Sequence, residues 1–217
     1  MLIDLHAHTV PISWDSSLTP AEMIDLSKKA GLDGICFTEH DSFWDPAECA
    51  RLAQEHDFLV LPGIEVNTYN GHLLAFGLTK SRYGMHLIEQ LTEMVEAEGG
   101  VMIAAHPYRR YMPWREMSGD DFERALAKAA ANPAYAHCVA LETAHGRAHP
   151  QQNAFSERLR ETLGMRSTGG SDAHQPSHVG RCATRFERRI ETLADLIQEL
   201  RAGRFEGVDL REAGGVV

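Results

Sequence analysis

The stretch Leu2-Ile3-Asp4-Leu5-His6-Ala7-His8 is a short apolar run that ends in two histidines separated by one residue. A run of this length is typical of a buried strand, and the two-residue period of a strand turns both imidazoles to one side. Two such imidazoles can bind one cation at about 2.0–2.1 Å. Alone, the His-x-His spacing fits structural histidines equally well, so its meaning depends on the residues at the ends of the other strands.

Short apolar runs alternate with helical segments along the whole chain, which is the pattern of βα units around a parallel sheet. We expect strands at Leu2–Leu5, Gly34–Phe37, Phe58–Leu61, Leu73–Phe76, Val101–Ala104, Cys138–Leu141 and Arg166–Thr168. We expect helices at Pro20–Ala30, Pro46–His56, Leu87–Glu98, Gly119–Ala131, Gln151–Leu163 and Ile190–Ala202. Thr19 and Asp45, each followed by a proline and then a glutamate, are helix start signals. Seven strands predict an α/β barrel.

The composition limits the kind of protein. The 217 residues suit one domain over positions 1–217, in which 210–217 read as a frayed tail. A net charge of −10 argues against extended nucleic acid as a partner, because that mode of binding needs clustered Lys and Arg. The chain has no signal-like or membrane-spanning stretch, and its four cysteines have no paired spacing. We expect a cytoplasmic protein without a membrane partner; its oligomeric state has no signal in the sequence.

Potential metal ligands follow nearly every expected strand, at the rim where parallel β/α barrels carry their chemistry. They are His6 and His8, His40, Glu65, His106, Glu142 with His145, and Asp172 with His174. In a closed barrel the last strand lies beside the first, so Asp172 and His174 should face the first histidine pair. Glu65 is the candidate bridge between two metals, which lie about 3.5–4 Å apart in two-metal sites.

Two further positions, His72 and Asp15, complete the candidate ligands, and the residue after His106 supports its assignment. Pro107 keeps His106 out of helical geometry and presents its imidazole to the rim. His72 opens an expected strand and is equally compatible with a structural role. Asp15, in a polar loop after His8, is either a hard ligand or a turn residue, and we favour the ligand.

With these residues in place, the chain resembles the polymerase and histidinol phosphatase (PHP) family. The motifs that carry the resemblance span residues 4 to 174 in family order: Asp4-Leu5-His6-Ala7-His8-Thr9, Thr38-Glu39-His40-Asp41, Pro62-Gly63-Ile64-Glu65, Ala105-His106-Pro107 and Gly170-Ser171-Asp172-Ala173-His174. The resemblance implies a single-domain, distorted (β/α)7 TIM-like barrel and hydrolysis of phosphate esters with two to three divalent metals (Zn, Mn, Fe or Mg).

The resemblance also implies a set of metal ligands, which are the residues of this chain that match the family motifs. The first metal takes His6, His8, Glu65 and Asp172; the second takes Glu65, His72 and His106; the third takes Asp15, His40 and His174. The chain departs from many relatives at His145, where the family segment Glu-Val-x-Asn has asparagine. This substitution leaves the role of that strand end open.

The expected function is phosphatase or phosphodiesterase action on a small phosphorylated metabolite or nucleotide through a metal-activated hydroxide. We expect Glu65, Asp172 and His174 to be catalytic, with His145 as another candidate proton donor. Guanidinium groups match the phosphate fork, so the substrate-binding candidates are Arg109, Arg110, His145, Arg147 and His178, with Arg181 as a further arginine. Two alternatives stay open: an amidohydrolase-like enzyme acting on C–N bonds, and a metal-binding regulatory domain without activity.

Overall fold

The computed structural model describes residues 1–113 and 117–211, and in this part of the chain one sheet of nine strands carries the fold. The strands are β1 (Leu2–Ala7), β2 (Gly34–His40), β3 (Leu59–Thr68), β4 (Gly71–Phe76), β5 (Val101–Ala104), β6 (Ala140–His145), β7 (Arg166–Gly170), β8 (Cys182–Phe186) and β9 (Phe205–Asp209). Their order is β7-β6-β5-β4-β3-β2-β1-β8-β9. The α/β barrel is therefore confirmed, and all seven expected strands are present.

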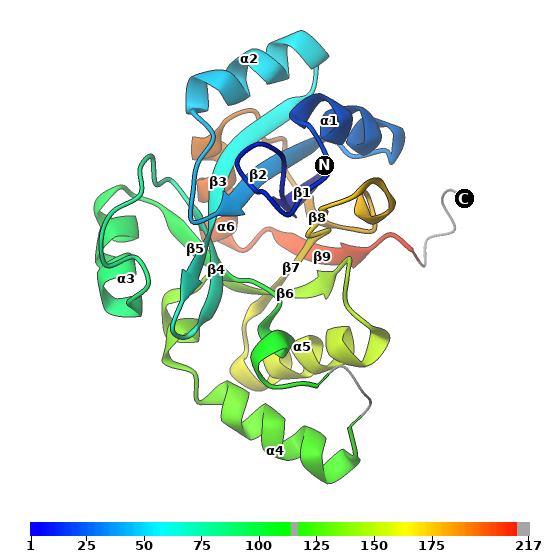
Figure 1. Cartoon of the computed structure of the whole chain (residues 1–217). Coiled ribbons are helices and arrows are strands. Elements are labelled where there is room, and N and C mark those ends of the chain that lie inside the picture. The colour runs from blue at the N-terminus through cyan, green and yellow to red at the C-terminus, as the bar shows by residue number, and fades with distance from the viewer. Residues whose placement is uncertain (114–116, 212–217) are drawn as a thin grey trace.

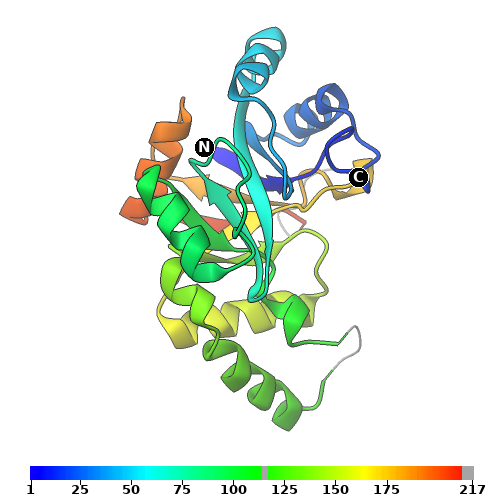
Figure 2. The ribbon, with the colours of Figure 1, turned by 60° about the vertical axis from the view of Figure 1, so that its left-hand side comes forward.

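The helices lie outside the strands, as Figures 1 and 2 show. They are α1 (Pro20–Lys29), α2 (Pro46–His56), α3 (Ile88–Ala97), α4 (Gly119–Ala130), α5 (Pro150–Leu163) and α6 (Leu193–Ala202). Thr19 and Glu22 form the expected capping box of α1, and Asp45 caps α2. No helix among the described residues is long and apolar enough to span a membrane.

The barrel is distorted because β4 runs against its neighbours. β4 pairs antiparallel with β3 and with β5, whereas β1, β2 and β3 are parallel, as are β5, β6 and β7. The reversal places the beginning of β4, rather than its end, at the rim where the parallel strands finish. His72 is the second residue of β4 and reaches the rim for this reason.

β1 meets the segment after β7 near the site, so the predicted neighbourhood of the first and last expected strands is confirmed. Ala7 pairs in parallel with Ala173, and the amide of Asp172 donates to the carbonyl of His6 at 2.8 Å. The two strands missed from the sequence, β8 and β9, add an antiparallel pair beside the start of β1. Residues 212–217, in the expected frayed tail, lie outside the described residues, while the Leu210 amide donates to the Arg181 carbonyl at 2.8 Å.

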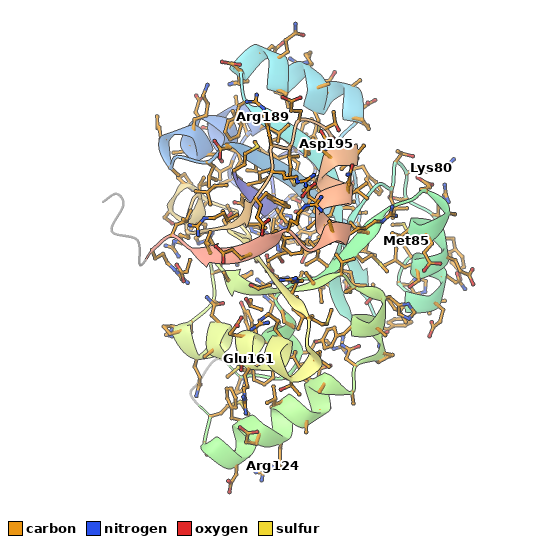
Figure 3. All side chains as sticks on the ribbon, turned by 180° about the vertical axis from the view of Figure 1, so that it is seen from behind. Lys80, Met85, Arg124, Glu161, Arg189 and Asp195 are labelled. Carbon is orange, nitrogen blue, oxygen red and sulfur yellow. The ribbon has the colours of Figure 1, made fainter. Side chains whose placement is uncertain are left out.

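The strands carry apolar side chains at one end of the barrel and polar ones at the other. One buried cluster joins Leu61 of β3 and Leu74 of β4 to α6, which Figure 3 shows from behind the molecule. Because side chains two apart in a strand share a face, Glu65 continues the line of Leu61, and His72 continues that of Leu74. The apolar layer thus supports a polar layer at the rim.

Candidate metal centre

His6 and His8 are fully buried at the end of β1. The register of β1 against β2 shifts between Asp4 and Ala7, and such irregularities re-aim side chains near active sites. The two rings lie 5.1 Å apart, so the structure brings the predicted pair to one place. Gly170 makes room for this arrangement, because a Cβ at its position would lie 2.5 Å from the Cβ of His6.

Four buried polar atoms at this place find no hydrogen-bond partner among the described residues. They are Nε2 of His6, Nε2 of His8, Oε2 of Glu65 and Oδ1 of Asp172. Oδ1 of Asp172 lies 3.5 Å from Nε2 of His6 and 3.2 Å from Nε2 of His8, which lies 3.4 Å from Oε2 of Glu65. Ligands of a tetrahedral metal at 2.0–2.1 Å are separated by about 3.3–3.4 Å. The spacing and the missing partners both fit a divalent cation.

Glu65 lies at the centre of the histidine cluster. Its carboxylate oxygens lie within 3.4 Å of imidazole nitrogens from β1, β2, β4 and the segment after β5: His6 (3.4 Å), His8 (3.4 Å), His40 (2.8 Å), His72 (2.7 Å) and His106 (2.7 Å). Both contacts to His72 and His106 are made by Oε1, while Oε2 faces His8 and His40. One carboxylate therefore faces two ligand groups, as a bridge must.

A third group of donors lies toward solvent. Oδ2 of Asp15 is 3.4 Å from Nε2 of His40 and 3.1 Å from Nε2 of His174. The two Nε2 atoms are themselves 3.4 Å apart. The rings of His8 and His40 stack at 4.2 Å, which joins this group to the first one. The structure thus gathers every predicted ligand at one rim.

The backbone is strained at two of the candidate ligands. His106 has φ of 28° and Asp172 has φ of 51°, in the left-handed region that residues other than glycine rarely adopt. Such conformations persist only where the surroundings enforce them, and they cluster at functional sites. Glu142 contributes here, because its Oε2 accepts a hydrogen bond from the His106 amide at 2.8 Å.

Two residues orient the ligands: Ser13, which the sequence did not single out, and Glu142, which the sequence indicated only as a potential ligand. Oε1 of Glu142 lies 3.0 Å from Nδ1 of His6, so it orients the ring and leaves Nε2 for a cation. The hydroxyl of Ser13 lies 3.3 Å from Nδ1 of His8 and has the same effect. The position of Glu142 after an expected strand was a visible signal, but its partner is 136 residues away.

The neutral state of two buried imidazoles favours metal binding. Burial lowers the pKa of His8 to about 4. Burial, together with the charge of Arg109, lowers the pKa of His106 to about 3. Both rings are neutral near pH 7 and have a lone pair to offer.

The remaining charges of the centre are coupled. Burial opposes charge on His6, but the carboxylates of Glu142, Glu65 and Asp172 raise its pKa well above the usual value. Burial likewise opposes charge on Glu65 and Asp172, yet the charge of His6 and hydrogen bonds from histidines hold the pKa of each carboxyl well below its usual range. A proton on His6 thus occupies the place that a cation would take.

The predicted substrate-binding residues divide into two groups. Arg109 pairs with Asp172, and Nη1 of Arg147 lies 3.2 Å from the same carboxylate. His145 is buried, with Nε2 at 3.2 Å from Asp172 and Nδ1 at 3.2 Å from the Tyr108 hydroxyl. These residues border the ligands directly.

A cavity of about 600 Å³ opens beside the ligands and has a largely basic wall. Its lining residues are Asp15, Ser17, Tyr108, Arg109, Arg147, His174, Gln175, His178 and Arg181. Among them, Nε2 of His178 lies 2.8 Å from Nε2 of Gln175. Arg110 is not in this wall and lines a different cavity.

The chain is similar in sequence to one protein family and to one curated protein. The model of the PHP-associated family matches residues 150–205. An uncharacterized protein of Methanocaldococcus jannaschii is 28% identical over 117 residues, which cover 50% of this chain and 68% of that protein.

Two solved structures show the likeness in fold. A two-domain protein of Bacteroides vulgatus, containing a predicted PHP-like metal-dependent phosphoesterase, superimposes with a TM-score of 0.69 and 19% identity over 96% of this chain and 64% of that chain. An amidohydrolase of Chromobacterium violaceum, solved with bound sulfate, superimposes with a TM-score of 0.61 and 18% identity over 98% and 99% of the two chains. At these identities the likeness establishes the fold alone.

Proposed function

Because the chain belongs to the PHP family, we propose that it is a metal-dependent phosphoester hydrolase acting on a small phosphorylated metabolite or nucleotide. The family motifs lie together at the rim of a barrel of the PHP type. The proposal rests chiefly on the four unpaired buried atoms with metal-like spacing, next to a cavity with a basic wall.

We assign the ligands to three metals as the motifs imply. The first is held by His6, His8, Glu65 and Asp172; the second by Glu65, His72 and His106; the third by Asp15, His40 and His174. Two of these groups coincide with clusters of close donor atoms, namely His6, His8 and Asp172, and Glu65, His72 and His106. In a further cluster His40 and His174 lie with His8, and Asp15 lies 3.4 Å from His40 and 3.1 Å from His174. So many imidazole nitrogens favour Zn, Fe or Mn over Mg, which prefers oxygen ligands.

Phosphate esters suit this site because of the charges at its mouth. Arg109 and Arg147 approach Asp172 from the cavity, and Arg181 and His178 line the same wall. Guanidinium groups bind phosphate oxygens bidentately and stabilise the charge that develops on them. An uncharged amide would leave most of this wall without a partner.

The catalytic roles follow from which atoms are free. Bound metals would lower the pKa of water toward about 7 and neutralise phosphoryl charge. Glu65 and Asp172 would hold the cations beside the arginines that line the cavity. Nδ1 of His174 faces the carbonyl of Asp172 at 2.9 Å, so Nε2 is the atom left to bind a metal or to hold a proton for the leaving oxygen. Both roles use the same atom and exclude each other, so the number of bound metals decides between them.

The second candidate is a hydrolase of C–N bonds, which the likeness in fold to the Chromobacterium violaceum amidohydrolase favours. The same metal centre can polarise a carbonyl oxygen. A domain that binds metal without turnover is the third reading. These readings differ in which compounds the metal-loaded protein converts.

A panel assay tests the proposal. Manganese-loaded protein is incubated with phosphomonoesters, phosphodiesters and amides of small metabolites, with and without chelator. We expect release of phosphate or of a phosphomonoester that the chelator abolishes. Turnover of amides alone would favour the amidohydrolase, and a fully loaded protein inert toward the whole panel would favour the binding domain.

A further inference from the structure

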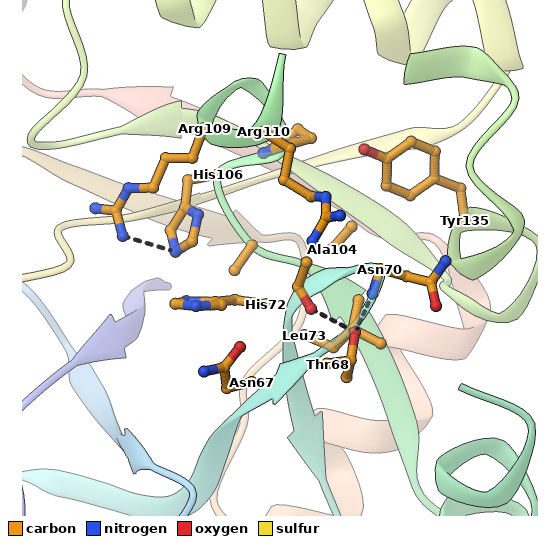
Figure 4. Close-up of a pocket in the computed structure, with 13 residues that line it drawn as sticks. Asn67, Thr68, Asn70, His72, Leu73, Ala104, His106, Arg109, Arg110 and Tyr135 are labelled. Carbon is orange, nitrogen blue, oxygen red and sulfur yellow. Dashed lines mark hydrogen bonds between the residues drawn. The ribbon is translucent and has the colours of Figure 1, made fainter. Parts of the chain in front are cut away.

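A second cavity, of about 140 Å³, adjoins the metal ligands at His72 and His106 (Figure 4). His72 and His106 form its border with the centre, and Arg109 belongs to both cavities. Its lining residues are Asn67, Thr68, Asn70, Gly71, His72, Leu73, Ala104, Ala105, His106, Pro107, Arg109, Arg110 and Tyr135. The volume equals about four or five water molecules at roughly 30 Å³ each, which leaves room for a phosphate or carboxylate group.

The charge of this cavity is unusual for the chain. The protein has 31 acidic against 21 basic residues, yet none of the described lining residues is acidic. Neutral polar side chains, among them Asn67, Thr68, Asn70 and Tyr135, line the cavity together with Arg110 (Figure 4). A group that enters this space meets positive charge and neutral polar side chains.

The charge of Arg110 has no ion-pair partner among residues 1–113 and 117–211. Arg109 pairs with Asp172, whereas Arg110 forms no ion pair with any described carboxylate. The two guanidinium groups point in different directions, Arg109 toward His106 and Arg110 over Asn70 (Figure 4). Arg110 therefore does not share the anion that Arg109 faces.

The fold makes room for this conformation of Arg110. The side chain crosses the turn between β3 and β4 at Gly71, where a Cβ would lie 3.1 Å from the Cδ of Arg110. Gly71 has φ of 115°, which other residues rarely adopt. A third cavity, of about 220 Å³, continues beyond Arg110 and is lined by Lys128 as well. Arg109, Arg110 and Lys128 thus provide positive charge in two cavities that share Arg110.

We propose that the Arg110 cavity is a specificity subsite for a second anionic group of the substrate, so that the enzyme prefers phosphate esters carrying another phosphate or carboxylate. This inference rests on the proposed phosphoester hydrolysis and adds the substrate class. The ester phosphate binds at the metals between Arg109 and Arg147, and the second anion binds Arg110 through its guanidinium fork.

The test compares substrate pairs that differ by one anion. Fructose 6-phosphate and fructose 1,6-bisphosphate differ by a phosphate, and phosphoethanolamine and phosphoserine differ by a carboxylate. Manganese-loaded wild type, Arg110→Gln, Arg110→Lys and the control Arg189→Gln are assayed for KM and kcat. Arg189 is exposed on the face shown in Figure 3 and pairs with Glu191 at 2.8 Å. Elemental analysis of each variant separates substrate binding from metal loading.

We expect the doubly charged member of at least one pair to have the lower KM. Arg110→Gln should raise that KM about 10- to 100-fold, as expected for the loss of a hydrogen bond to a charged group. Metal content should be unchanged, Arg110→Lys should recover part of the effect, and Arg189→Gln should match the wild type. The pair that responds distinguishes phosphate from carboxylate.

Equal KM values within both pairs, or a preference that survives Arg110→Gln, would overturn the subsite while leaving phosphoester hydrolysis in place. Failure of fully metal-loaded wild type to hydrolyse any phosphoester, in these pairs or in the panel, would overturn the proposed function and this inference with it.

Discussion

Removal of the metals should destabilise the protein strongly, because four buried polar atoms that lack a hydrogen bond among the described residues then lose the cation that would bind them. The atoms are Nε2 of His6, Nε2 of His8, Oε2 of Glu65 and Oδ1 of Asp172. A buried polar atom without a partner costs about 1–3 kcal/mol, so the four together cost about 4–12 kcal/mol. For a domain of this size 1 kcal/mol shifts Tm by about 2–4 °C. Even the lower limit predicts a fall in Tm of about 8 °C or more.

The assay is thermal unfolding of protein that has been stripped with chelator, dialysed, and then reloaded with Zn²⁺ or Mn²⁺. Metal content is measured on the same samples by elemental analysis. Metal at about 1,000 times its Kd adds about 4 kcal/mol by mass action, in line with the lower structural limit. The gain in Tm should therefore keep rising with the logarithm of the free metal concentration after the sites are filled.

Two variants make the measurement specific. His8→Asn removes one of the four atoms and should lose most of the gain in Tm on reloading. His56→Asn is the matched control, because His56 lies at the end of α2, 3.6 Å from Asp25 and away from the centre. If stripped and fully reloaded wild type melt within about 2 °C of each other, the four atoms are not metal ligands and the reasoning fails.

Three further predictions concern the same centre. Glu65→Gln should abolish turnover and lower metal content, since the carboxylate contacts donors of more than one metal; an active, fully loaded variant would remove Glu65 as the bridge. Glu142→Gln should weaken metal binding about 10- to 100-fold in a chelator competition, because it orients the ring of His6, and unchanged affinity would contradict that role. Metal affinity should fall as the pH drops from 7 to 5, because the raised pKa of His6 lets a proton compete with the metal, while His8, with a pKa of about 4, stays neutral. Calorimetry in buffers of different ionisation enthalpy should detect proton release on binding at pH 7, and its absence would contradict the assignment to His6.

The seven expected strands could be predicted because each is a short apolar run buried in the sheet. β8 and β9 could not: Cys182–Phe186 contains an exposed Arg185, and Phe205–Asp209 contains Gly207. These segments become strands because they pair with β1 and with each other. No local sequence pattern predicts this pairing. The reversal of β4 did have a signal, because Asn70-Gly71 is a strong hairpin turn sequence.

The candidate site was visible from the sequence because parallel strands bring their ends to one rim. This rule alone predicts that the polar residues after the strands lie close together. The roles of Glu142 and Arg110 could be assigned only from the structure. Glu142 acts on a histidine far away in the chain, and Arg110 differs from its neighbour Arg109 only in the direction of its side chain. Sequence position does not encode either relation.

The meeting of β1 with the segment after β7 gives the metals a further effect, on the unfolded chain. A cation held by His6 and Asp172 joins positions about 165 residues apart, in a protein whose four cysteines, all among the described residues, are free. By the loop-closure relation used for disulfides, a link of this length restricts the unfolded ensemble by about 5 kcal/mol, if the ion stays bound to both ends. The ion would then serve as a removable cross-link, and the stability of the barrel would depend on the supply of metal.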